Sequence, residues 1–207
     1  MKKGLLIILS GPSGVGKGTV RQEILKNPAV DLYYSVSLTT RAMRPGEADG
    51  REYYFVTNEE FDANLANGNL LEWNQFVGNR YGTPKDKVEA KRLAGHNVLL
   101  EIDVNGATQV LSKMKDPGVV SIFLAPPSFE SLEARIRGRS TESEDAIQAR
   151  LEKARLEVAL KDRYDYVVVN DTVEQAAKDI EKIIFDKIRA FPGNNKSNGM
   201  SFSSWSN

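Results

Sequence analysis

Apolar residues gather in four short, nearly continuous runs along this chain, and helical patterns lie between them. The runs span residues 5–9, 98–102, 119–124 and 166–169. Runs of this length without polar alternation are typical of parallel strands that helices cover on both faces. The pattern therefore predicts an α/β fold built on a parallel sheet.

Three of the helical patterns have clear signals at an end. Residues 17–26 form a pattern that stops before Pro28, and residues 129–136 carry Phe, Leu and Ile on one face. Residues 172–175 read Thr-Val-Glu-Gln, a capping box that begins an amphipathic helix with apolar residues at 176, 180, 183 and 184. Strands that alternate with such helices support the parallel sheet.

The middle third of the chain breaks this rhythm. Residues 34–38, 52–56 and 71–76 are polar, β-like pieces, and a capped helix begins at Thr57 among them. We interpret this stretch as an inserted lobe of mixed α/β structure, at about residues 38–83.

One domain accounts for most of the chain. Its 207 residues suit a single domain, which we place at 1–192, with a second, charged insertion at 137–150. Residues 193–207 are rich in Asn, Ser and Gly and predict a flexible tail. The first apolar run is too short for a signal peptide or a membrane span, so we expect a cytoplasmic protein.

Charge and composition exclude several classes of function. Lys and Arg number 28, as do Asp and Glu, so the net charge of zero argues against a general nucleic-acid-binding surface. The chain has no Cys, which excludes disulfides and thiolate chemistry. His96 is the single histidine, so a multi-histidine metal site is excluded too. A local basic pocket for a small anionic ligand stays compatible with this composition.

A glycine-rich loop follows the first apolar run and begins the first helix. Its spacing is that of a P-loop, in which backbone N–H groups surround phosphate oxygens at a helix N-terminus and a lysine reaches the β- and γ-phosphates. The structural alternative is a glycine-rich turn between strand and helix that binds nothing. The order of strand, loop and helix, however, is the context that a P-loop requires. The predicted ATP-binding residues here are Gly11, Pro12, Ser13, Gly14, Val15, Gly16, Lys17, Gly18 and Thr19.

The loop departs from the general P-loop pattern at one position. Gly18 stands where the pattern has Ser or Thr, and the hydroxyl follows at Thr19. We therefore expect Thr19 to contact Mg²⁺ either directly or through water.

Two arginines mark the start of the inserted lobe. Arg41 and Arg44 lie in a loop behind hydroxyl residues, where planar guanidinium groups suit a phosphate. Tyr53, Glu72 and Tyr81 follow in the lobe. Taken singly, these residues have ordinary alternatives: solvated loop charges, β-sheet packing and a surface acid.

Together with the P-loop, these motifs resemble guanylate kinases of the bacterial type, in the same order and over about residues 4–190. The resemblance implies a nucleoside monophosphate kinase with a P-loop core, a lobe that binds GMP and a lid. It implies ATP and GMP as substrates and Mg²⁺ as cofactor. It leaves the oligomeric state open, a homodimer included.

The resemblance also assigns roles in the lobe. It implies that Arg41 and Arg44 hold the acceptor phosphate, that Tyr53 and Tyr81 donate to it, and that Ser37 and Glu72 bind the guanine edge. Thr83 is a further base contact. A carboxylate suits guanine, because it can accept from the adjacent N1–H and N2–H donors, whereas adenine would leave it unpaired.

Glu101 and Asp103 end the second apolar run on one face of the predicted strand. The carboxyl end of a parallel strand faces the ligand crevice. The resemblance places acids here near the guanine and the magnesium shell, although many relatives carry Asp at the position of Glu101. The alternative is a strand end in solvent.

In the second insertion, the resemblance implies a lid that brings arginines to the transferred phosphate, first Arg139 and Arg150, then Arg137. The alternative is an exposed basic helix face balanced by Glu142, Glu144 and Asp145, and Arg135 is compatible with it. Asn170, after the fourth run, is implied to lie near the adenine of ATP, and its alternative is a helix N-cap.

The resulting hypothesis is the reaction ATP + GMP → ADP + GDP, catalysed by alignment and by the charges of Lys17, Mg²⁺ and the arginines. Three alternatives differ from it in kind: an interaction module with the same fold, a kinase for another nucleoside monophosphate, and a P-loop GTPase. The intact Lys17 and lid arginines argue against the module. Neither GTPase signature, Asp-x-x-Gly nor Asn-Lys-x-Asp, is clear.

Overall fold

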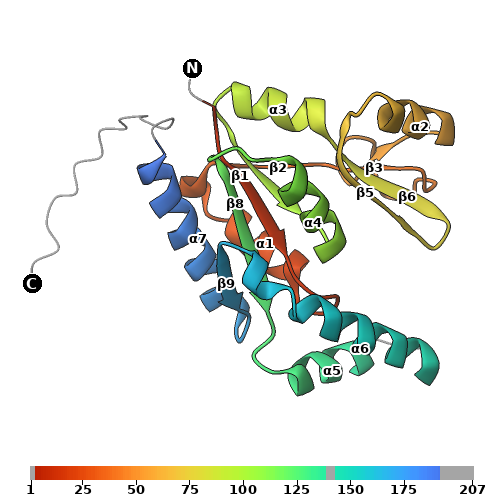
Figure 1. The fold of residues 1–207 in the computed structure, drawn as a ribbon, viewed down its shortest axis with the longest axis vertical. Coiled ribbons are helices and arrows are strands. Elements are labelled where there is room, and N and C mark those ends of the chain that lie inside the picture. Colours follow the sequence, from red (N-terminus) through yellow and green to blue (C-terminus); the bar gives the residue numbers. More distant parts are fainter. Residues whose placement is uncertain (1–2, 139–142, 192–207) are drawn as a thin grey trace, which may run out of the picture.

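The computed structural model describes residues 3–138 and 143–191, so Arg139 and the predicted tail at 193–207 lie outside the described residues. Two sheets organise this part of the chain, and most of the helices lie around the larger one (Figure 1). The strands are β1 (Leu6–Ser10), β2 (Leu32–Tyr34), β3 (Leu38–Thr39), β4 (Tyr54–Phe55), β5 (Leu70–Phe76), β6 (Asn79–Pro84), β7 (Asn97–Glu101), β8 (Val119–Ala125) and β9 (Tyr166–Val169). The helices are α1 (Lys17–Leu25), α2 (Asn58–Ala66), α3 (Lys85–Leu93), α4 (Val104–Lys113), α5 (Phe129–Gly138), α6 (Glu144–Val158) and α7 (Val173–Ala190), with short 3₁₀ turns η1 (Pro28–Val30) and η2 (Lys161–Arg163).

The larger sheet has five parallel strands in the order β2-β7-β1-β8-β9. Successive residues of its central strand β1 point to opposite faces, as the strand period requires. Ile7 packs in one buried cluster with residues of α1, α5, α6 and α7, whereas Leu6 and Ile8 pack in another with residues of α3 and α4. The predicted α/β fold with helices on both faces of a parallel sheet is confirmed.

The predicted lobe contains the smaller sheet, with four strands in the order β4-β3-β6-β5. The β3–β4 pair is parallel and the other pairs are antiparallel. Leu38, Phe61 and Leu70 form its own small core. Helix α2 begins with the predicted capping box, in which the side chains of Thr57 and Glu60 each accept from the other's backbone N–H.

The sequence interpretation differs from the structure at one strand of this region. Residues 34–38 do not form one β-like piece of the lobe: β2 ends at Tyr34 and pairs with β7 in the larger sheet, and β3 begins at Leu38 in the smaller one. The chain therefore crosses from core to lobe between these two strands. Both strands are too short to show a hydrophobic period.

Arg92 of α3 is fully buried at the N-terminal end of the larger sheet. Its guanidinium pairs with Glu89 at 2.8 Å and with Asp116 at 3.0 Å, and its Nε donates to the Gly4 carbonyl at 3.0 Å. Lys3 pairs with the same two acids. A buried guanidinium needs such partners, and here they join the first strand, α3 and the turn before β8.

The larger sheet ends at the edge strand β9, where Val167 and Val169 are 44% and 49% exposed.

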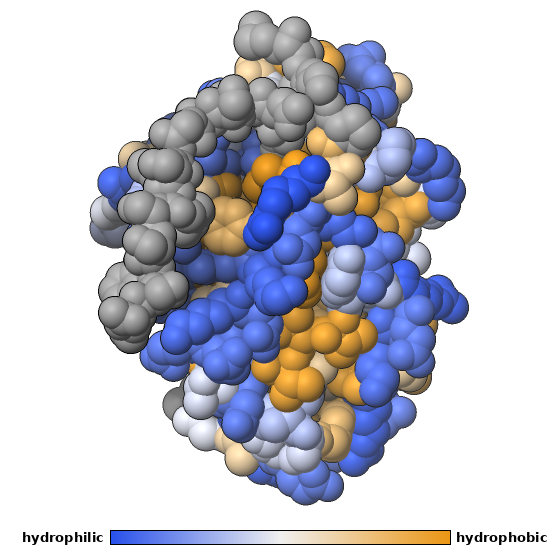
Figure 2. Space-filling model, turned by 90° about the vertical axis from the view of Figure 1, so that its left-hand side faces the viewer, coloured by the Kyte–Doolittle hydropathy of each residue, from blue (hydrophilic) through white to orange (hydrophobic). Residues whose placement is uncertain are grey.

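Figure 2 shows the left-hand side of Figure 1 face on, with hydrophilic side chains surrounding small hydrophobic areas. None of the helices in the described ranges is long and apolar enough to cross a bilayer.

Candidate active site

The predicted P-loop joins the end of β1 to the start of α1. Gly14 and Gly16 have φ values of 86° and 98°, a region that L-amino acids with side chains rarely adopt. A Cβ at Gly11 would lie 2.3 Å from the Leu124 carbonyl oxygen, so this loop also requires glycine for close packing on β8.

Lys17 lies at the first position of α1, and its side chain folds back over the loop. Its Nζ donates to the carbonyl oxygens of Gly11 at 2.6 Å and Pro12 at 3.2 Å. Burial lowers the pKa of Lys17, and the acids Glu101 and Glu157 oppose that shift. The ammonium group is therefore held beside the loop by carbonyl groups that a phosphate oxygen could replace.

The other side of the loop faces Asn170 and Arg135. The Asn170 Nδ2 donates to the Val15 carbonyl at 2.8 Å, whereas its Oδ1 is buried without a partner. Arg135 donates to the same Val15 carbonyl and to the backbone carbonyl of Asn170. A cavity of about 250 Å³ lies here, and Thr19 lines it together with both residues. The predicted adenine residue is thus adjacent to the P-loop, in a cavity separate from the acids of β7.

A second cavity, of about 490 Å³, lies between the lobe and the carboxyl end of β7. It contains six of the residues that the sequence assigned to GMP, and it brings together side chains from both sheets. Its described lining residues are Ser37, Tyr53, Glu72, Asn74, Gln75, Phe76, Tyr81, Glu101, Ile102, Asp103 and Lys153. We call it the acceptor cavity.

A β-bulge aims Glu72 into the acceptor cavity. In the pairing of β5 with β6, Leu70 lies opposite Pro84 and Trp73 opposite Gly82, so β5 has one extra residue between these positions. Gln109 of α4 hydrogen-bonds the backbone groups of Trp73 at the bulge. Its Oε1 accepts from the Trp73 N–H at 3.2 Å, and its Nε2 donates to the Trp73 carbonyl at 2.8 Å.

The Glu72 side chain is almost fully enclosed, at 6% exposed. The Thr83 hydroxyl donates to its Oε1 at 2.5 Å. Its Oε2 lies so close to α4 that a Cβ on Gly106 would be only 2.8 Å away. Burial raises the pKa of Glu72 to about 7; the Thr83 hydrogen bond opposes this shift and the charge of Asp103 adds to it.

Asp103 connects the two sheets at the base of the acceptor cavity. Its Oδ1 caps α4 by accepting from the Gly106 N–H at 2.8 Å, and its Oδ2 accepts from Asn74 of β5 at 2.9 Å. Glu101, two residues earlier in the chain, forms an ion pair with Arg21 of α1 at 3.2 Å. Its Oε1 lies 3.6 Å from the position of a Cβ at Gly18. A side chain at residue 18 would therefore contact this carboxylate.

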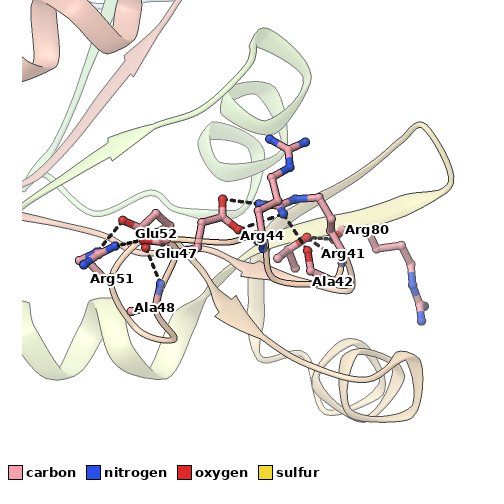
Figure 3. A network of polar contacts seen from close by, with 10 residues as sticks. Arg41, Ala42, Arg44, Glu47, Ala48, Arg51, Glu52 and Arg80 are labelled. Carbon is pink, nitrogen blue, oxygen red and sulfur yellow. Dashed lines mark hydrogen bonds and ion pairs between the residues drawn. The ribbon is translucent and has the colours of Figure 1, made fainter.

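Figure 3 shows the loop that carries the two predicted phosphate arginines. The Arg41 guanidinium reaches Glu47, with nitrogen–oxygen distances of 3.0 and 2.8 Å, and lies 5.4 Å from the centre of the Tyr53 ring. Arg44 is exposed, and its backbone N–H donates to the same carboxylate. Neither arginine lines the acceptor cavity in this arrangement, although Arg41 packs on Tyr53, which does.

The predicted lid arginines are divided in the described structure. Arg150 of α6 donates to the Ser13 Oγ at 3.2 Å and so lies on the P-loop. Arg137, at the end of α5, pairs with Glu133 and Glu144, which raise the pKa of its guanidinium. Arg139 is outside the described residues.

Several residues of this site were not predicted from the sequence, among them Gly106, Gln109 and Lys153. Gly106 and Gln109 belong to α4, which approaches the lobe only after the chain has folded. Lys153 belongs to the charged helix α6 and would have been found only by extending the predicted lid beyond residue 150.

The sequence model of the family described as Guanylate kinase matches residues 3–187. A guanylate kinase of Mycoplasma mycoides subsp. mycoides is 55% identical over 184 residues, 89% of this chain and 61% of that protein, so the chain spans about three fifths of that relative's length. One of Streptococcus thermophilus is 52% identical over 88% of this chain and 87% of its own.

A solved structure is similar as well. The guanylate kinase of Anaplasma phagocytophilum superposes with a TM-score of 0.70 at 36% identity, over 90% of this chain and 87% of that one. Sequence and fold therefore agree: the chain belongs to the guanylate kinase family.

Proposed function

We propose that the protein transfers the γ-phosphoryl group of ATP to the phosphate of GMP, giving ADP and GDP. The observation that carries this proposal is the acceptor cavity, in which the buried Glu72 of the lobe meets the acids at the carboxyl end of β7. Strand β7 is the parallel neighbour of β1, whose carboxyl end leads into the P-loop. Within the proposal, residues 1–192 are one kinase domain, with a GMP-binding lobe at about 38–83 and a lid at about 137–150.

Glu72 supports guanine as the acceptor base. Ionised, its carboxylate can accept from the N1–H and N2–H of guanine while Thr83 holds the other side of the group. A base without these two donors would leave a buried carboxylate unpaired, which costs about 1–3 kcal/mol or more for a charged group. Ser37 lines the same cavity and adds a hydroxyl.

Lys17 and the arginines supply the charge that phosphoryl transfer requires. The acceptor oxygen belongs to a phosphate and is already ionised, so no general base is needed. Lys17 would exchange its bonds to Gly11 and Pro12 for phosphate oxygens, and Arg41 would exchange Glu47 for the acceptor phosphate. Tyr53 and Tyr81 pack edge to face, 5.7 Å apart, and offer their hydroxyls in the same cavity.

The residues present also fit a magnesium ion. Magnesium prefers oxygen ligands and keeps several waters and phosphate oxygens, so one or two carboxylates suffice. Glu101 and Asp103 offer such oxygens in the acceptor cavity, whereas Thr19 lines the cavity on the Asn170 side. When bound, Mg²⁺ would neutralise charge on the β- and γ-phosphates. Thr19 as a ligand and a cytoplasmic location stay predictions from the sequence.

The proposal is tested by following ADP release from ATP and Mg²⁺ with GMP, AMP, CMP or UMP. We expect turnover with GMP alone. Lys17→Ala should abolish it, whereas Lys26→Ala, an exposed lysine at the end of α1, should not.

The alternatives give different results in the same assay. Turnover with another nucleoside monophosphate would be compatible with the same fold and mechanism, but it would contradict the proposal that Glu72 selects guanine. If the folded wild-type protein releases no ADP with any of the four, the kinase proposal is wrong and the interaction module becomes the better account.

A further inference from the structure

The acceptor cavity is short of positive charge for a ligand that carries a phosphate. Glu72, Glu101 and Asp103 line it, and both predicted phosphate arginines lie outside its lining. Among the described residues that line it, Lys153 is the only one with a positive charge. A dianionic acceptor in this cavity therefore meets Lys153 before any arginine moves.

Helix α6 holds Lys153 at this place. Arg150, Lys153 and Glu157 are spaced by three and four residues, so they lie on one face of the helix. Arg150 donates to the Ser13 Oγ at 3.2 Å, and Glu157 accepts from the Ser13 N–H at 3.4 Å. Both ends of this face thus contact the P-loop, and Lys153, between them, is directed to the cavity beside the loop.

The Lys153 ammonium group is free to move within that region. Its ion pair with Glu157 is loose, since Glu157 Oε1 is 3.6 Å from the ammonium nitrogen and the Lys153 side chain is 59% exposed. A lysine has a flexible four-carbon stem and acts on phosphate as a compact point charge. Tyr53 and Tyr81, which the family resemblance assigns to the acceptor phosphate, line the same cavity.

We propose that Lys153 binds the phosphate of the acceptor nucleotide, as a cation supplied by α6 beyond those that the family resemblance assigns. The inference rests on the proposed function, because it takes GMP as the ligand of the acceptor cavity. It makes Lys153 a residue that joins acceptor binding to the helix lying on the P-loop.

The test compares GMP with guanosine, which lacks the phosphate, by titration calorimetry and by steady-state kinetics. Lys153→Met removes the charge and keeps the length of the side chain. We expect it to weaken GMP binding and raise the KM for GMP on the order of tenfold, the loss of one charge-assisted hydrogen bond, with the KM for ATP unchanged. Guanosine binding should not change, and Lys153→Arg should restore most of the GMP affinity.

A control on α7 removes an equal charge elsewhere. Lys178→Met changes an exposed lysine that does not line the acceptor cavity, and it should behave as the wild-type protein does. Unchanged GMP affinity in Lys153→Met, or an equal loss for guanosine, would overturn the inference while wild-type turnover of GMP leaves the proposed function in place. A wild-type protein that neither binds nor phosphorylates GMP would instead refute the proposed function, and the inference with it.

Discussion

Glu72 combines a charge that the proposed chemistry needs with surroundings that disfavour it. The bulge in β5 turns the residue inward, and α4 covers it, so water is largely excluded from the carboxylate. Burial is the largest cause of its raised pKa, and Asp103, at the N-terminus of α4, adds a second negative charge nearby. A carboxyl group with a pKa of about 7 changes its charge in the neutral pH range, where the proposed reaction would be measured.

The KM for GMP should therefore depend on pH. With a pKa of about 7, free Glu72 is mostly protonated at pH 6, and guanine needs the ionised form, so binding must release a proton. We expect the KM for GMP to rise about tenfold for each pH unit below 7 and to level off above it, while the KM for ATP changes little. Steady-state kinetics at a series of pH values, from about 1.5 units below to about 1.5 units above that pKa, measure this dependence.

Glu72→Gln supplies the control for this dependence. A carboxamide of the same shape does not titrate, so the variant should have a high KM for GMP at every pH in the range. A pH dependence that survives in Glu72→Gln would assign the titration to another group.

Gly106 should be required for the position of Glu72. A methyl group at residue 106 would lie 2.8 Å from Glu72 Oε2 and displace the carboxylate, although Ala is favoured over Gly inside a helix by about 1 kcal/mol. Gly106→Ala should therefore lower kcat/KM for GMP by about ten- to a hundredfold, the equivalent of one or two lost hydrogen bonds, without lowering the melting temperature.

Asn105→Ala is the matched control for that substitution. It changes the exposed neighbour in the same helix turn and should leave the use of GMP unchanged. If Gly106→Ala kept full kcat/KM for GMP, the carboxylate of Glu72 would not need its present position next to residue 106, and the prediction would be wrong.

The sequence predicted site residues where a local motif or the family resemblance marked them. The P-loop glycines and Lys17 have a fixed spacing, and their conformation follows from that spacing. Gly106 and Gln109 have no such mark, because a glycine in a helix only lowers its propensity and a glutamine is neutral. Their roles arise from the approach of α4 to a bulge more than thirty residues earlier in the chain.

At the scale of elements, the apolar runs were sufficient to predict the buried strands β1, β7 and β8. They also located β9, but as a buried strand, whereas it is the edge of the sheet and two of its valines are exposed. Strand β2 was not recognised as a strand of the larger sheet, and its last residue, Tyr34, was placed in a β-like piece at 34–38, because its three half-buried residues carry no period that separates core from lobe. Helix α3 was not predicted, and its most buried side chain is the charged Arg92, which a hydrophobic pattern cannot recognise.

Arg92 should be the residue on which the attachment of α3 depends most. Arg92→Met fills the space but leaves Glu89 and Asp116 without their buried partner, and we expect it to lower the free energy of unfolding by about 3 kcal/mol at pH 7. Lys85→Met in the same helix, at an exposed position, should change it little. Urea unfolding of both variants measures the difference.

The same effect should fade in acid. Partial burial opposes ionisation of Asp116, but hydrogen bonds from Lys3 and the Gly118 N–H and the charge of Arg92 lower its pKa to about 2. A depressed pKa stabilises the folded state above the ordinary value of 3.8, and this contribution is lost as the pH falls toward 2. The difference between Arg92→Met and the wild-type protein should shrink over that window. A difference independent of pH would mean that packing, not charge, is responsible.

At the scale of the whole molecule, a seam between β5 and α4 joins the lobe to the core. The Gln109 side chain hydrogen-bonds both the N–H and the carbonyl of Trp73. Lys113 donates to the Leu71 carbonyl at 3.2 Å, and Asn74 donates to Asp103. The break in hydrophobic rhythm predicted that a lobe exists, but no local pattern encodes this seam. The acceptor cavity lies beside it, so the position of Glu72 relative to the P-loop depends on contacts between two separately folded sheets.

Gln109→Ala should loosen the lobe without unfolding the core. The substitution leaves the N–H and carbonyl of Trp73 without their side-chain partner, at a cost of about 1–3 kcal/mol that falls on the seam. We expect faster amide hydrogen exchange in β5 and β6 and a higher KM for GMP, with exchange in β1 and β8 and the KM for ATP unchanged. Ser112→Ala, which removes an exposed hydroxyl one turn along α4, is the control. Uniformly faster exchange in both sheets would show that lobe and core unfold as one unit, and the seam would then have no separate role in placing Glu72.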